Sequence, residues 1–207
     1  MKNSKRQLNK NMEKPSCKPL KKEFLANFLV TKPKIVTLAY HLEREQELHS
    51  GCIIDLETTG LDPQLHHIIT FGILKKNIAQ VYQLTNPGYV SFKALATQKT
   101  QRSQTPRYAY NTRFESDFIG IQKGWHDLTQ YTERRGGYDW NNPDFDPYIP
   151  MRLDQCTLTP FQEPDIIGAD VPILWEQWLT KHKPQTLWAI VFHNLSDLLR
   201  TKQLIKT

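Results

Sequence analysis

Two acidic residues, Asp55 and Glu57, stand two positions apart at the end of an apolar run that begins at Cys52. In a strand, residues at i and i+2 point to the same face, so we expect the two carboxylates to lie side by side. Like charges beside a buried run repel each other and resist desolvation, and a hard divalent cation relieves both effects. The alternative is a strand that ends in solvent, where the same spacing is harmless.

Two further acidic candidates lie in predicted helices. Glu115 falls in the first turn of a helix predicted over Arg113–Ile121, and the alternative for it is an exposed acid favoured there by the helix dipole. Asp117 is two positions further along and points to another side of the helix, so it is not expected to substitute.

His193 and Asp197 stand four positions apart, on one face of a helix predicted over Gln185–Ile205. An imidazole near a metal-bound water can act as a general base at neutral pH. The alternative is a capping or surface pair, although the apolar residues on either side place this stretch partly in the core.

The residues around these candidates resemble the DEDD family of 3′–5′ exonucleases in the ribonuclease-H-like superfamily. Ile53–Pro63 followed by His67–Gly72 resembles the first motif, a strand ending in D-x-E-T-T-G-L and then a second strand. Asn111–Glu115 resembles the second motif, N-x-x-F-D, with Glu in place of Asp. His193–Asp197 reads H-N-x-x-D and resembles the third. The long interval between the second and third motifs resembles the spacing in the branch called predicted ribonuclease-H-like exonucleases. The resemblance covers about Gly51–Leu204.

The resemblance implies an α/β, ribonuclease-H-like fold with a mixed five-stranded sheet and helices on both faces. It also implies two divalent ions, Mg²⁺ or Mn²⁺. Asp55 would bridge both ions, Glu57 and Asp197 would ligate one, and Glu115 would support the other, with His193 as general base. We also expect two residues inside the motifs, Thr58 and Asn111, to contact nucleic acid.

The function expected from this site is hydrolysis of phosphodiester bonds, most simply as a 3′–5′ exonuclease on single-stranded ends. Two alternatives stay open. The chain could be a catalytically weak or inactive nucleic-acid-binding module, which the Glu at position 115 favours. It could also be a metal hydrolase acting on another kind of substrate.

The elements that must position these residues follow from hydrophobic periodicity. The chain from residue 86 to residue 106 shows little periodicity and is expected to be a surface excursion. A charged helical piece is expected near His41–Leu48. The other predicted elements are the strands Ile35–Ala39, Cys52–Leu56, His67–Leu74, Ala79–Leu84 and Arg107–Tyr110 and the helices Arg113–Ile121, Val171–Lys181 and Gln185–Ile205.

A long irregular loop, Tyr131–Tyr148, is rich in aromatic residues and carries Arg134 and Arg135. Stacking on unpaired bases and contacts to phosphates are the functional interpretation. Packing of the loop against the domain is the alternative.

Charge is distributed unevenly along the 207 residues, whose net charge is +6. Residues 1–34 hold ten Lys/Arg and two Glu, a net +8, and the remainder holds 17 basic and 19 acidic residues, a net −2. We predict a disordered basic leader over residues 1–22, an N-terminal extension over 23–50 and a nuclease domain over 51–207. The leader fits a polyanion partner such as DNA or RNA; a solvated tail that aids solubility is the alternative.

Composition also limits the compartment and the partners. The three cysteines, Cys17, Cys52 and Cys156, are scattered and lack zinc-ligand spacing, which favours a reducing, cytoplasmic compartment. No apolar stretch approaches the length of a membrane helix, so no membrane partner is expected.

Overall fold

The computed structural model describes residues 34–43, 47–87, 92–129, 153, 157 and 165–205. A single six-stranded mixed sheet runs through this part of the chain, in the order β1-β4-β3-β2-β5-β6. The predicted α/β, ribonuclease-H-like class is confirmed, with six strands in place of the expected five. The strands are β1 (Ile35–His41), β2 (Cys52–Thr58), β3 (Ile68–Lys75), β4 (Ile78–Leu84), β5 (Arg107–Ala109) and β6 (Trp125–Asp127).

Strand β1 corresponds to the strand predicted at Ile35–Ala39 and lies in the segment that we assigned to the N-terminal extension, whereas β6 was not predicted from the sequence. It pairs antiparallel with β4 along its whole length, from Ile35 opposite Leu84 to His41 opposite Ile78. Its Leu38 belongs to a buried cluster with Val81 and Leu195. The sheet therefore gains a strand at the edge far from β5 and β6.

The central strand is β2, and it lies where the direction of the sheet changes. It pairs antiparallel with β3 and parallel with β5, and six of its seven residues are buried. A strand covered on both faces needs apolar side chains at nearly every position. Asp55 is the one residue of β2 that is only partly buried.

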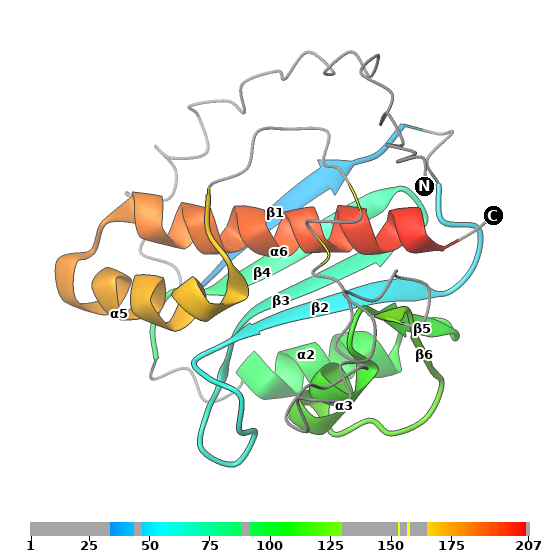
Figure 1. Ribbon diagram of the computed structural model, residues 1–207, viewed down its shortest axis with the longest axis horizontal. Coiled ribbons are helices and arrows are strands. Elements are labelled where there is room, and N and C mark those ends of the chain that lie inside the picture. Colours follow the sequence, from blue (N-terminus) through cyan, green and yellow to red (C-terminus); the bar gives the residue numbers. More distant parts are fainter. Residues whose placement is uncertain are drawn as a thin grey trace, which may run out of the picture.

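Five helices accompany the sheet in the described part of the chain, and Figure 1 shows the long α6 in front of β1, β4 and β3. Helix α6 contacts β2, β3 and β4, whereas α2 packs on β3 and α3 on β2, β5 and β6. Helix α5 lies beside α6. The bounds are α2 (Phe92–Gln101), α3 (Thr112–Ile119), the 3₁₀ helix η3 (Gly168–Asp170), α5 (Val171–Lys181) and α6 (Pro184–Leu204).

Alternation along β2 decides which face carries the acids. Ile53 clusters with Leu195 and Leu198 of α6, whereas Cys52 and Ile54 cluster with residues such as Phe92 of α2. Because side chains alternate, Asp55 and Glu57 share the face of Ile53, under α6.

One sequence-based expectation about secondary structure was wrong, and another falls partly outside the described residues. The supposed surface excursion at residues 86–106 contains α2, whose Phe92, Ala96 and Thr100 are buried. Only these three positions are buried, with Leu95 packing partly buried against the core, which is why the helix shows so weak an apolar pattern. The helical piece expected near His41–Leu48 lies partly outside the described residues, which omit 44–46; His41 ends β1, and the Leu42 amide donates to the Asn77 carbonyl.

The three remaining predicted helices are present, each within two residues of its expected ends. Helix α3 ends at Gly120, whose left-handed backbone lets its amide donate to the Ser116 carbonyl. The basic leader and the loop with Arg134 and Arg135 lie outside the described residues. Within the described ranges, none of the helices combines the length and apolar character that crossing a bilayer requires.

Candidate metal centre

Asp55 and Glu57 lie near the end of the central strand, β2, on the face that α6 covers. Glu57 is buried and Asp55 is partly buried. The pairing of β2 with β3 shifts by one residue between Glu57 and Thr58, where the strand leaves the sheet. The two carboxylates therefore sit on a rigid strand just before a loop, which fixes their positions while leaving room in front of them.

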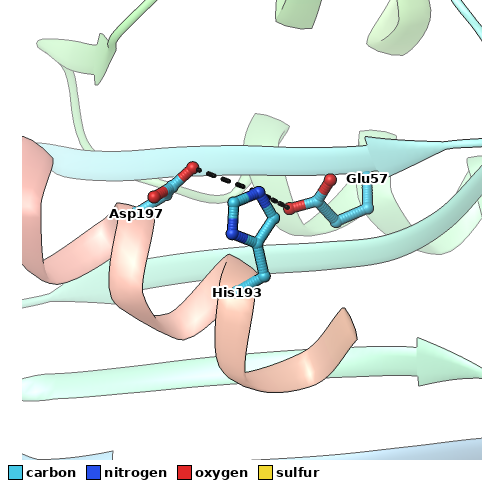
Figure 2. Close-up of side chains that lie close together, drawn as sticks. All are labelled: Glu57, His193 and Asp197. Carbon is cyan, nitrogen blue, oxygen red and sulfur yellow. Dashed lines mark ion pairs between the residues drawn. The ribbon is translucent and has the colours of Figure 1, made fainter. Parts of the chain in front are cut away.

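Helix α6 brings His193 and Asp197 over the same place. The Nε2 atom of His193 lies 3.9 Å from Oε1 of Glu57 and 3.8 Å from Oδ2 of Asp197. Figure 2 shows the imidazole between the two carboxylates, with the helix in front of the sheet. One ligand atom of each of these three residues lies within 4.8 Å of the others, close enough to share one ion.

The fourth acidic residue, Glu115, comes from the first turn of α3 and is 4% exposed. Its Oε2 atom is buried and has no hydrogen-bond partner among the described residues. An unsatisfied buried carboxylate oxygen is costly, so this position calls for a cation or a proton. Asp117, by contrast, is exposed and lies 3.9 Å from Arg113, away from the cluster, as its place on the helix predicted.

The pKa values of the acids in the cluster also indicate a need for a cation or a proton. Burial raises the pKa of Asp55 well above its ordinary value, and Glu57, Asp197 and Glu115 raise it further. Burial also raises the pKa of Glu57, with Asp197 and Glu115 adding to the effect. Burial is again the main cause of the raised pKa of Glu115, and Asp127 contributes. Without a cation the site therefore favours protonated carboxyls.

The donor set fits a divalent metal ion. Carboxylate oxygens suit Mg²⁺ and Mn²⁺, and an imidazole nitrogen within reach suits Mn²⁺ better than Mg²⁺. The orphaned Oε2 of Glu115 and the mutual repulsion of the acids are both relieved by positive charge at this point. Glu57, His193 and Asp197 are close enough together to share one ion, and Asp55 and Glu115 line the same cavity without belonging to that group.

A cavity of about 640 Å³ opens over the cluster. Several of its lining residues were not singled out from the sequence as site residues. Arg200 lies one turn after Asp197 and donates from Nη1 to Asp197 Oδ1 over 3.4 Å. The 3₁₀ helix η3 and the start of α5 also contribute, through Ile167, Gly168 and Pro172. Their signal in the sequence is weak because a loop and a helix start carry no periodic pattern.

The residues expected to contact nucleic acid are placed as follows. Thr58 and Asn111 both line the cavity. Thr58 is buried and its hydroxyl donates to the Gly60 carbonyl over 2.6 Å, so it shapes the loop after β2. Asn111 is exposed at the start of α3 and its side chain makes no capping hydrogen bond. Arg134 and Arg135 lie outside the described residues.

The mixed sheet with helices on both faces, and the acids gathered beside its central strand, define a ribonuclease-H-like α/β protein with a candidate metal centre. The family model of the RNase H superfamily matches residues 52–207, and the chain belongs to this superfamily. An uncharacterised protein of Methanocaldococcus jannaschii is 24% identical over 170 residues, which cover 74% of this chain and 92% of that protein. Membership indicates nuclease-type hydrolysis of nucleic acid, and nucleases of this superfamily typically use divalent metals.

Proposed function

We propose that this protein is a metal-dependent exonuclease that hydrolyses phosphodiester bonds from the 3′ end of single-stranded nucleic acid. The observation that carries the proposal is the convergence of acids from β2, α3 and α6 in one cavity, beside His193. A structural ion-pair network would place cations among these acids, but Arg200 is the one Lys or Arg among the described residues that line the cavity.

Each residue has a distinct role in the proposal. Asp55 would bridge two metal sites, with Glu57 and Asp197 on one and Glu115 on the other. Bound divalent ions would activate a water molecule and stabilise the leaving oxygen. His193 accepts the proton of the attacking water at Nε2, the atom that faces Glu57 and Asp197. Arg200 holds the Asp197 carboxylate through its hydrogen bond to Oδ1, the oxygen that His193 does not face.

The cavity mouth supports a single-stranded substrate. Leu61 is 83% exposed and Ile167 is 38% exposed, although both line the cavity. Tyr110 and Phe114, both half-buried, add aromatic surface to the cavity wall. Apolar and aromatic side chains in such a position can hold unpaired bases by stacking, without reading their sequence.

Assignment to the DEDD branch and to the cytoplasm belongs to this proposal. It rests on the H-N-x-x-D and D-x-E-T-T-G-L motifs for the branch, and on three scattered cysteines for the compartment. The substituted second motif is compatible with the branch, because Glu115 reaches the cavity with an oxygen to spare.

A second candidate is a nucleic-acid-binding module that has lost catalysis. Glu in the second motif is the observation that favours it, because the longer side chain alters the distance from helix to metal. The basic leader would then supply most of the affinity.

The experiment that decides between the two is a time course on 5′-labelled single- and double-stranded DNA and RNA with Mn²⁺. An exonuclease acting from the 3′ end gives a ladder that shortens one nucleotide at a time, and Asp55→Asn gives none. Binding without product in the wild type would establish the binding module instead. Internal cuts would retain the hydrolase and remove the exonuclease assignment.

A further inference from the structure

One side chain outside the acidic cluster contacts it directly. Asn194 follows His193 on α6 and is completely buried. Its Nδ2 donates to Oδ2 of Asp55 over 2.6 Å, a short hydrogen bond between helix and central strand. Hydrogen bonds to a charged acceptor are shorter and stronger than those between neutral groups.

The neighbouring strand is shaped to admit this side chain. Gly72 on β3 stands directly opposite Asp55 in the register of the two strands. A Cβ atom at position 72 would fall 2.1 Å from Oδ1 of Asn194 and 2.8 Å from Cδ1 of Leu198. Both distances are shorter than van der Waals contact, so no larger residue fits while α6 stays at this height. Because Gly72 has no side chain, Asn194 can approach the sheet closely enough to reach Asp55.

Burying the side-chain amide of Asn194 costs free energy, and filling space in the core does not require an amide. Its Oδ1 is buried and has no hydrogen-bond partner among the described residues. A leucine has nearly the same branched shape and would fill the same space without an orphaned polar atom. The amide is therefore a better fit to an orienting role than to core packing.

We propose that Asn194 is a positioning residue, which holds the carboxylate of Asp55 in the orientation needed to ligate metal. Gly72 allows the Asn194 amide to approach the sheet closely enough for this contact. The inference rests on the proposed function for the identity of the metal site. A neutral donor suits this role, because it fixes one oxygen of Asp55 without bringing a positive charge that would compete with the ion. The other oxygen of Asp55, Oδ1, and the second lone pair of its Oδ2 remain available for ligation.

The test measures Mn²⁺ affinity with the metal alone, from the electron paramagnetic resonance signal of free Mn²⁺, on the full chain. Asn194→Leu is the main variant, because it preserves shape and removes the orphaned oxygen. We expect thermal stability without metal to be retained or raised, and Mn²⁺ affinity to fall about 10–100-fold, the range for residues that orient a ligand. On single-stranded oligonucleotide, kcat should fall by a similar factor with KM little changed.

Ser196→Ala is the matched control. Ser196 is also completely buried on α6, and its hydroxyl donates to the Phe192 carbonyl, away from the cluster. This variant should keep wild-type Mn²⁺ affinity. A folded Asn194→Leu protein with wild-type Mn²⁺ affinity would overturn the inference, as would an equal loss of affinity in Ser196→Ala.

Gly72→Ala provides an independent approach to the same hydrogen bond. The added methyl group should push Asn194 from Asp55 and weaken Mn²⁺ binding, and adding it to Asn194→Leu should cost little further affinity, because the hydrogen bond is already absent. Fully additive losses would contradict the inference. If Asn194→Leu loses Mn²⁺ affinity while the wild type cleaves no nucleic acid, the positioning role stands and the nuclease assignment fails. If the wild type cleaves nucleic acid and Asn194→Leu binds Mn²⁺ as tightly as the wild type, the nuclease assignment stands and the positioning role fails.

Discussion

His193 and Glu57 face each other across the junction of helix and sheet, with Nε2 of the imidazole 3.9 Å from Oε1 of the carboxylate (Figure 2). The same Nε2 lies 3.8 Å from Asp197, one turn further along α6. These distances are too long for direct hydrogen bonds and are short enough for the groups to share one ion. The imidazole is therefore placed either to take a proton from a water or to become a ligand itself.

Replacing His193 distinguishes the two roles. If the imidazole is the general base, His193→Ala should lower kcat by about 10²–10⁴ and leave Mn²⁺ affinity nearly unchanged. The acidic limb of the pH–rate profile should change as well. A loss of Mn²⁺ affinity would make His193 a ligand instead, and a wild-type rate with unaltered pH dependence would remove it from the mechanism. Asp197→Asn is the control on the same helical face, because it should weaken metal binding and rate together.

Asp55 is the residue whose replacement should separate binding from chemistry. It contacts Asn194, and its pKa is raised by burial and then by the other three acids, so its charge is coupled to theirs. Asp55→Asn should abolish cleavage while affinity for a labelled oligonucleotide stays equal or rises, because it removes one negative charge from a site that receives phosphates. Normal turnover by the purified variant would disprove the assignment of the cluster.

The raised pKa of Glu115 predicts how stability depends on pH. Burial favours the neutral acid in the folded protein, so between the unfolded and the folded pKa the native state binds more protons than the unfolded chain. The free energy of unfolding of the metal-free protein should therefore fall as pH rises through this window. Glu115→Gln removes the effect, since its amide does not ionise.

The measurement is thermal unfolding of both proteins in EDTA between about pH 4 and pH 8, a range chosen to start near the ordinary carboxyl pKa. The variant should match the wild type at the acidic end and become more stable toward the alkaline end. Each unit of pKa elevation is worth about 1.4 kcal/mol, and that corresponds to roughly 3–6 °C in Tm for a protein of this size. Added Mn²⁺ should stabilise the wild type more at the alkaline end, and should stabilise the variant less. A Tm difference independent of pH would show that Glu115 titrates normally.

The basic leader is tested by deleting residues 1–22. Because this segment is strongly basic and precedes the described sheet, the shortened protein should fold and retain cleavage while binding nucleic acid more weakly. The slope of log affinity against log salt should become shallower by about 0.7–0.9 for each phosphate that the leader neutralises. Identical slopes for the two proteins would show that the leader does not touch the nucleic acid.

Much of the candidate site could be predicted from local sequence. The spacing of Asp55 and Glu57 places both on one face of a strand, and that of His193 and Asp197 places both on one face of a helix, as the structure shows. Periodicity specifies such relations because each lies within a single element, where geometry repeats every two or 3.6 residues. The D-x-E-T-T-G-L motif also led to the superfamily, which the match over residues 52–207 confirms.

Tertiary structure decided what depends on contacts between distant segments. Three such features are relations between elements. Strand β1 pairs with β4, α2 lies where no periodic pattern predicted a helix, and Asn194 reaches Asp55 over Gly72. Glu115 likewise meets the other acids only because β5 pairs parallel with β2 and carries α3 to that end of the sheet. The sequence by itself determined which residue types could bind a metal and which faces they occupy. Packing of α6 on the sheet determined their distances, because strand pairing and close helix–sheet contact depend on side chains far apart in the chain.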